Sequence, residues 1–283
     1  MRFAANSKNG FWETQQFRAM LLLKRARQFV LYRNATPKTL LFVVGCQRSG
    51  TTLLRHIFRY DLDTVTYYEN SDLSRGDPAR IRLDPLPDVK RRMLANRAPL
   101  VVAKPLVESQ NLDLLLDMHP DARGIWMFRR FEDVVHSSVR FFKGGTGFRD
   151  LAPILAGDQT NWRVEKMGEA DLQTIKDLFS EEIGPHDAAA LFWFARNSLF
   201  FSRGFHEDPR VRLCFYDDLV SRPGETMREL YRHIGRPYPG DRILRDVSRD
   251  FKGKGRELPL RAPIREVCDR LLERMLALPR AGA

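Results

Sequence analysis

The sequence predicts an α/β protein in which helices flank a P-loop-like central parallel sheet, folded as a single domain. Three observations support this fold class. From Leu40 onward, short β-rich runs alternate with helical patterns, as in βαβ units built around a parallel sheet. A glycine loop joins the first β-rich run to the first of these helical patterns. The chain has 283 residues, 43% of them hydrophobic, which is enough to bury one sizeable core.

Five runs have the composition of strands, and they lie at 40–45, 64–69, 100–104, 124–129 and 211–216. Helices are expected between them, starting near Gly50, Pro87, Ser109 and Phe131. Ser109 is expected to cap its helix, because a serine hydroxyl can accept hydrogen bonds from the free amides of a first turn. Residues 1–39 precede the first strand and are expected to form an N-terminal helical extension to the domain at 40–283.

The second half of the chain has three further segments. The segment 143–185 has no strong strand pattern and begins and ends near glycines. This indicates an insertion or lid. The segment 186–205 is apolar around most of its circumference, which predicts a buried helix. Apolar residues recur at three and four positions from Ile264 to Leu276, which predicts a final amphipathic helix against the sheet.

The basic segment at 11–32 has two interpretations. It can form an amphipathic helix that lies on a membrane or a partner, or an ordinary packed helix, and we favour the second. Its most apolar run, 20–23, is far shorter than the roughly 20 residues that a membrane span needs. Neither a signal peptide nor a membrane anchor is therefore expected, and any membrane contact would be peripheral.

The amino-acid composition limits the kinds of molecule that the protein is expected to bind. Lys and Arg total 47 against 36 Asp and Glu, so the formal charge is 47 − 36 = +11, and the surface should attract anions. The basic residues are spread along the chain rather than interleaved with aromatic ones, so no specific nucleic-acid binding is expected. The three cysteines, Cys46, Cys214 and Cys268, are far apart and odd in number, which argues against disulfides or a metal site and for a reducing, cytoplasmic compartment.

The glycine loop has the G-x-x-x-x-G spacing of a P-loop, and it runs through Gly45, Cys46, Gln47, Arg48, Ser49, Gly50, Thr51 and Thr52. Backbone N–H groups and a helix N-terminus converge on an anion in such a loop. Thr51 stands where the P-loop has the Lys that neutralises β- and γ-phosphates. The cation of this loop is Arg48 instead, which favours a donor with less charge than a triphosphate.

A second motif begins at Arg129, at the end of a predicted strand, with Asp133 four residues later and Ser137 eight residues later. Arg129 and Ser137 can both face a phosphate that lies beside the carboxyl edge of the sheet. With this pair, the loop at 47–52 resembles the nucleotide site of sulfotransferases that use 3′-phosphoadenosine-5′-phosphosulfate (PAPS), in the Arg variant of tyrosylprotein and many bacterial enzymes.

The resemblance implies roles for these residues. Arg48, Ser49, Gly50, Thr51 and Thr52 would hold the 5′-phosphosulfate, and Arg129 and Ser137 the 3′-phosphate. A late basic loop containing Lys252, Gly253 and Lys254 is similar to the donor-binding loop of the family in composition and position. The segment 143–185 would be a lid or an acceptor-binding insertion.

The resemblance also suggests the catalytic residues. Cytosolic members use a His in a Lys-Thr-His segment, but Lys104 here is followed by Pro105 and no His is present. In the tyrosylprotein branch the base is a Glu about twenty residues after the loop Arg, and Glu69 lies 69 − 48 = 21 positions after Arg48. Glu69 is therefore the candidate base, and Lys104 and Arg48 are candidates for stabilising the leaving group.

The expected activity is transfer of a sulfuryl group from PAPS to a hydroxyl or amine, leaving 3′,5′-adenosine bisphosphate and requiring no metal. The acceptor is left open among glycan, peptide, lipid and small phenol, with a carbohydrate as one option, and so is the oligomeric state. Two alternatives remain: a P-loop kinase or NTPase with an atypical loop, and a non-enzymatic protein that binds polyanions.

Overall fold

The computed structural model describes residues 9–32, 37–143, 146–247 and 257–280, with side chains from residue 19 onward. Its centre is a sheet of five parallel strands in the order β2-β3-β1-β4-β5. The strands are β1 (Thr39–Gly45), β2 (Thr64–Tyr67), β3 (Leu100–Ala103), β4 (Ala122–Phe128) and β5 (Val211–Phe215). The five predicted strands are all present, and the predicted α/β class is confirmed.

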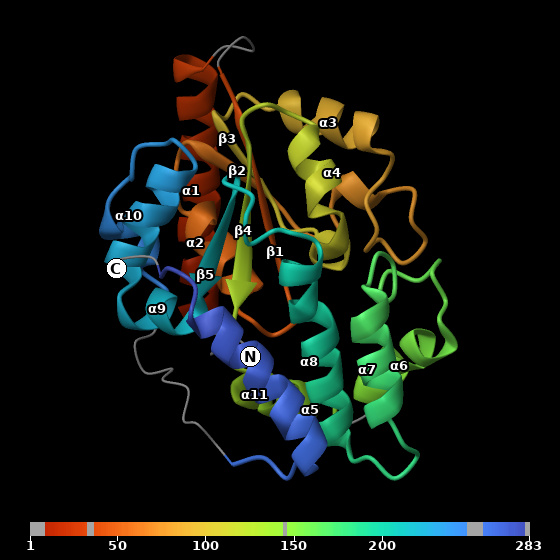
Figure 1. The fold of residues 1–283 in the computed structure, drawn as a ribbon. Coiled ribbons are helices and arrows are strands. Elements are labelled where there is room, and N and C mark those ends of the chain that lie inside the picture. The colour runs from red at the N-terminus through yellow and green to blue at the C-terminus, as the bar shows by residue number, and fades with distance from the viewer. Residues whose placement is uncertain (1–8, 33–36, 144–145, 248–256, 281–283) are drawn as a thin grey trace.

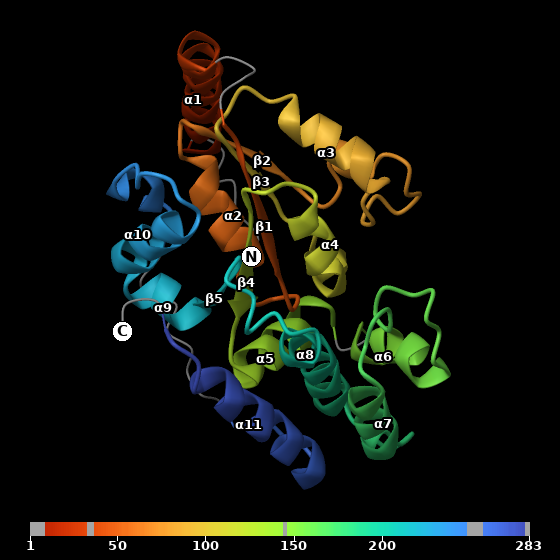
Figure 2. The same cartoon turned by 45° about the horizontal axis from the view of Figure 1, so that its top comes forward.

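Helices cover both faces of the sheet (Figures 1 and 2). One face packs against α2 (Thr51–Arg59), α9 (Tyr216–Ser221), α10 (Pro223–His233) and the 3₁₀ helix η3 (Asp241–Leu244). The apolar side chains of the other face join those of α3 (Leu86–Leu94), α4 (Leu112–Asp117), α5 (Phe131–Phe141) and α8 (Pro185–Ser202). The 3₁₀ helices η1 (Asp72–Ser74) and η2 (Leu106–Asn111) connect elements near the carboxyl edge.

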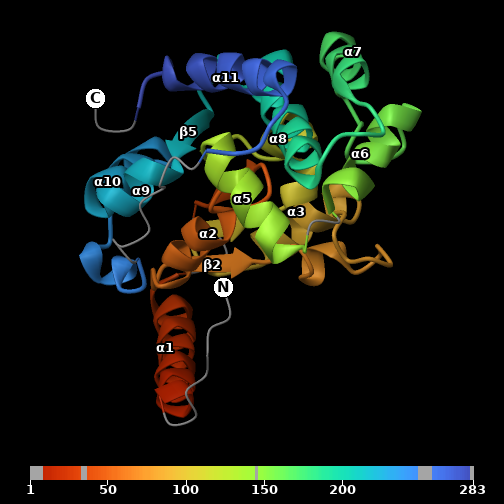
Figure 3. The ribbon, with the colours of Figure 1, turned by 90° about the horizontal axis from the view of Figure 1, so that it is seen from below.

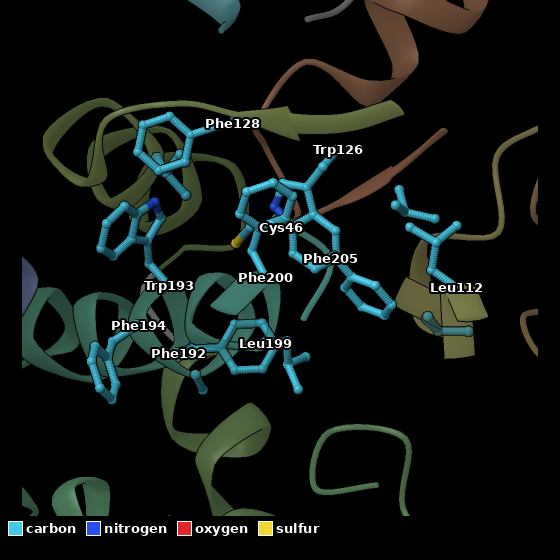
Figure 4. Close-up of a cluster of buried hydrophobic side chains, with 14 of the residues drawn as sticks. Cys46, Leu112, Trp126, Phe128, Phe192, Trp193, Phe194, Leu199, Phe200 and Phe205 are labelled. Carbon is cyan, nitrogen blue, oxygen red and sulfur yellow. The ribbon is translucent and has the colours of Figure 1, made fainter. Parts of the chain in front are cut away.

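Helix α8 is the buried helix that the sequence predicts at 186–205. Figure 4 shows its aromatic side chains facing those of β4. The ring centroids of Trp126 and Phe200 are 5.3 Å apart, and those of Phe128 and Trp193 are 5.8 Å apart. This aromatic contact joins α8 to the strand that ends at the second predicted motif.

The segment 143–185 contributes to the core. It forms α6 (Thr146–Ala156) and α7 (Glu169–Leu178), which pack beside α8 and bury Leu151, Ile154 and Ile175. The last helix, α11 (Ala262–Leu276), lies where the sequence predicts it, but its partner differs. It packs mainly on α8, with the Cys268 thiol 3.6 Å from the carbonyl oxygen of Ala190, rather than mainly on the sheet as expected, because α8 covers that face.

The N-terminal helix α1 (Asn9–Leu31) extends away from the sheet in Figure 3. The expectation of an ordinary packed helix is wrong in one respect: buried Lys24 and Gln28 face the protein, whereas Leu22 and Phe29 are exposed. Within the described residues, none of the helices has both the length and the apolar character that crossing a membrane requires.

Candidate functional site

The loop between β1 and α2 depends on two glycines. Gly45 and Gly50 have φ angles of 129° and 94°, which other residues rarely adopt. A Cβ atom on Gly45 would lie 2.4 Å from the backbone oxygen of Met127, and one on Gly50 would lie 2.4 Å from a ring carbon of Tyr216. The close approach of β4 and α9 to this loop therefore requires glycine at both positions.

Ser109 supports the start of the loop from η2. Its buried hydroxyl accepts a hydrogen bond from the Gly45 N–H at 3.1 Å and donates to the Leu106 carbonyl at 2.7 Å. The predicted role of Ser109 as a helix cap is wrong, because it lies within η2, and α4 begins only at Leu112. Its hydroxyl serves the backbone of β1 instead, 64 positions away in the chain.

The residues of the loop differ in exposure. Ser49 is fully buried, and its N–H donates to the Cys46 carbonyl at 3.3 Å. Thr51 is buried and Thr52 is exposed at the N-terminus of α2, where the first amides have no partner within the helix. These amides and the positive end of the helix dipole can bind an anion without any side chain.

Arg48 joins the loop to the second motif. Its Nε donates to the Ser137 Oγ on α5 at 3.1 Å, and its guanidinium lies 4.2 Å from the centre of the Phe141 ring. Arg129, immediately after β4, donates from Nη1 to the Arg48 carbonyl at 3.4 Å. The two motifs predicted to bind the two ends of one nucleotide thus meet at the same corner of the sheet.

Two guanidinium groups share this corner. Burial, and then the positive charge of Arg129, lower the pKa of Arg48. Arg129 is itself buried, forms an ion pair with Asp133 at 3.6 Å and stacks on Tyr216 with 4.2 Å between guanidinium and ring centre. A bound anion would offset the repulsion between the two cations, so the electrostatics of the corner favour a phosphate or a similar group.

Trp193 fixes the backbone at Arg129. Its indole Nε1 donates to the Arg129 carbonyl at 3.0 Å, and the side chain is fully buried on α8. Trp193 and Asn197 lie in the segment that the sequence predicts to be a buried helix, and both are fully buried. The hydrogen bond to the strand end is not evident from the sequence, because it joins residues 64 positions apart.

Glu69 and Lys104 form an ion pair. Glu69 follows β2 in a turn, Lys104 follows β3 directly, and these strands are neighbours in register at Tyr67 and Ala103. The Lys104 Nζ lies 2.8 Å from Glu69 Oε1, with the lysine side chain buried and the carboxylate partly exposed. The structure therefore brings together the two predicted catalytic side chains at the carboxyl edge of β2 and β3.

Arg55 is a buried cation on α2 beside this pair. Its guanidinium stacks on the Tyr68 ring at 3.5 Å and donates from Nη1 to Thr66 Oγ1 at 3.3 Å. Burial lowers its pKa. Arg55 thus holds the end of β2 against α2 and fixes the turn that carries Glu69. Arg55 cannot be recognised from the sequence, since a basic residue inside a short helix carries no signal of burial.

A cavity of about 320 Å³ lies beside the end of β2. It is lined by Tyr67, Asp72, Arg75, Arg92, Ala95 and Asn96. Two of these residues, Tyr67 and Asp72, lie two positions before and three positions after Glu69 in the chain. The lining is mostly polar and includes two arginines.

Two further expectations concern the late basic loop and a metal site. Lys252, Gly253 and Lys254 lie outside the described residues. Among the residues that are described, no three His, Cys, Asp or Glu side chains gather as a metal site would need.

Comparison with solved structures finds sulfotransferases, the family that the two motifs resemble. The sulfotransferase domain from the curacin biosynthetic pathway is 15% identical, with a TM-score of 0.48 over 84% of this chain and 99% of that one. The enzyme from Alicyclobacillus acidocaldarius is 16% identical, with a TM-score of 0.48 over 86% and 94%. The one from Mycobacterium avium is 15% identical, with a TM-score of 0.43 over 95% and 83%. No family model and no curated protein matches the chain.

Proposed function

We propose that the protein is a sulfotransferase that uses PAPS as donor and a hydroxyl or amine compound as acceptor. The observation that carries the proposal is the contact between the two motifs. Arg48 of the loop bonds to Ser137 at 3.1 Å, and Arg129 bonds to the Arg48 carbonyl at 3.4 Å. A nucleotide with anionic groups at both its 5′ and 3′ positions matches a corner with two arginines, a hydroxyl and a helix N-terminus.

The loop suits the 5′-phosphosulfate. Gly45 and Gly50 allow the backbone to approach closely, and the first amides of α2 would bind the phosphate oxygens. Arg48 would supply the positive charge that the P-loop takes from its Lys. The hydroxyl of Thr52 and the backbone of Ser49, Gly50 and Thr51 are proposed to complete this site.

Glu69 is proposed to take the proton of the acceptor hydroxyl. As the acceptor oxygen bonds to sulfur, the bond between sulfur and the phosphate oxygen breaks, and the proton passes to the carboxylate. Lys104 and Arg48 would stabilise the charge that develops on the leaving oxygen. The ion pair at 2.8 Å keeps the candidate base and the candidate stabilising cation next to each other.

The cavity beside β2 is proposed as part of the acceptor site, because its lining flanks Glu69 in the chain. Its polar lining favours a hydroxylated acceptor, such as a carbohydrate, over an apolar phenol. The segment 143–185 is proposed to shape this side of the site through Glu165, whose carboxylate accepts from Gln110 at 2.9 Å and pairs with Arg82 at 2.9 Å.

The test is transfer of the labelled sulfuryl group from PAPS to a panel of glycans, tyrosine peptides, hydroxylated lipids and phenols, in buffer with EDTA. We expect turnover with at least one acceptor class without added metal, because arginine and lysine supply the positive charge. No transfer from PAPS, together with magnesium-dependent ATP hydrolysis, would favour a kinase or NTPase. Salt-sensitive heparin binding without nucleotide binding would favour a polyanion-binding protein.

A further inference from the structure

The outer face of α1 is apolar. Leu22, Leu23, Phe29 and Val30 are 67%, 59%, 67% and 78% exposed, and Ala26 between them is exposed as well. Positions 22, 23, 26, 29 and 30 repeat at three and four residues, so they form one stripe along the helix. Among the described residues, this stripe contains the most exposed large apolar side chains of the protein.

The inner face of the same helix is polar. Lys24 donates to the Arg59 carbonyl at 2.9 Å, and Gln28 donates to the Leu62 carbonyl at 2.8 Å. Arg27 binds the Asp63 carboxylate with two hydrogen bonds, at 2.8 and 3.0 Å. The helix is thus attached through hydrogen bonds at the end of α2 and the start of β2, with its apolar stripe turned outward, the reverse of a helix packed on a core.

The positive charge around α1 indicates which kind of partner covers the stripe. Residues 1–33 contain seven Lys and Arg and one Glu, a formal charge of 7 − 1 = +6, and two of the seven, Lys24 and Arg27, face the protein. Arg25 is exposed beside the stripe, and the Arg97 guanidinium stacks on Phe29 at 4.3 Å. A second copy of this chain has a net charge of +11 and would repel this basic segment, whereas an anionic lipid surface has the opposite charge.

We propose that the stripe Leu22, Leu23, Ala26, Phe29 and Val30 docks on an anionic lipid surface. The helix lies along the surface, its apolar side chains enter between the headgroups, and basic residues beside the stripe bind lipid phosphates. The candidate site is at the carboxyl edge of the sheet, whereas α1 is attached at the amino edge, where Arg59 ends α2 and Asp63 precedes β2. Nucleotide binding is therefore independent of this surface.

The first test is sedimentation of the full chain with vesicles of phosphatidylcholine, alone or with a third of phosphatidylglycerol. We expect binding to the anionic vesicles that falls as salt is added. The triple variant Leu22→Gln, Phe29→Gln, Val30→Gln should lose at least about tenfold in binding, because three apolar side chains no longer transfer into the lipid. Leu114→Gln, which changes a side chain 45% exposed on α4, should bind as the unchanged protein does.

A second measurement does not depend on how the triple variant folds. The three native cysteines are buried, and burial raises the pKa of Cys46 and of Cys214 to about 12, so a dye should label Val30→Cys selectively. A polarity-sensitive dye at this position should shift its emission to the blue with anionic vesicles, and a dye on Leu114→Cys should not.

Three results would overturn the proposal. The first is absence of binding to anionic vesicles. The second is unchanged binding by the triple variant, which would assign the contact to the basic surface in general. The third is a wild-type dimer that the triple variant converts to a monomer without any vesicle binding, which would make a second copy the partner.

Discussion

Glu69 and Lys104 illustrate how the fold brings two candidate catalytic residues together. Neither residue is unusual in the sequence, and a Glu at the end of a strand is most often a solvated residue. The parallel register of β2 and β3 places the side chains that follow each strand next to each other, 2.8 Å apart. The Glu69 carboxylate is partly exposed, whereas the Lys104 side chain is buried.

Glu69→Gln should lower kcat by roughly 10²- to 10⁴-fold, because the amide keeps the size of the side chain but cannot accept the acceptor proton. Affinity for 3′,5′-adenosine bisphosphate should change little. Steady-state kinetics and calorimetry measure the two quantities. Asp88→Asn, which changes a carboxylate paired with Arg91 on α3, is the matched control and should keep normal turnover. A Gln variant with near-normal kcat would make Glu69 structural.

The sequence is most informative about residues whose role depends on local pattern. Gly45, Arg48 and Gly50 are recognisable because a loop between a strand and a helix constrains them locally. Ser109 and Trp193 support the same loop and strand end through hydrogen bonds to backbone atoms 64 positions away. A hydroxyl or an indole in a sequence does not reveal which distant carbonyl or amide it will meet, so these roles appear only in the structure.

At the scale of elements, burial explains what the sequence predicts well. The strands β1, β3 and β4 are buried along almost their whole length and therefore appear as largely apolar runs, whereas three of the four residues of β2 are only half-buried. The partner of α11 and the orientation of α1 were not predictable in the same way. An amphipathic pattern shows that a helix has an apolar side, but the surface that covers that side depends on which elements have already occupied the sheet.

The attachment of α1 should depend on pH through Lys24. Burial lowers the pKa of Lys24 to about 8, against 10.5 for the unperturbed group. Between these values the unfolded chain binds more protons than the folded one, so this group makes the protein more stable as pH rises from 8 toward 10.5. Urea unfolding of the wild type and Lys24→Gln should show the wild type gaining stability relative to the variant over this range. A constant difference would mean that Lys24 stays charged in the folded protein.

At the scale of the whole molecule, the sheet brings together parts of the chain that are far apart in sequence. Arg48 and Arg129 are 81 positions apart, and they meet because β1 and β4 are parallel neighbours in register at Gly45 and Met127. The order β2-β3-β1-β4-β5 places the loop between the strand that precedes Lys104 and the strand that precedes Arg129. The fold class and both motifs follow from the sequence, but the direct bond from Arg48 to Ser137 does not, because side-chain partners across 89 positions leave no local pattern.

Calorimetric comparison of 3′,5′-adenosine bisphosphate with AMP tests the central claim most directly, because the two ligands differ only in the 3′-phosphate. The bisphosphate should bind roughly 10- to 100-fold more tightly, since charge-assisted hydrogen bonds from Arg129 and Ser137 are made only to that phosphate. Arg129→Ala should remove most of the difference and leave AMP binding nearly unchanged, whereas Arg270→Ala on the exposed side of α11 should have no effect. Equal affinities for the two nucleotides in the unchanged protein would contradict the assignment of the second motif and, with it, the proposed donor.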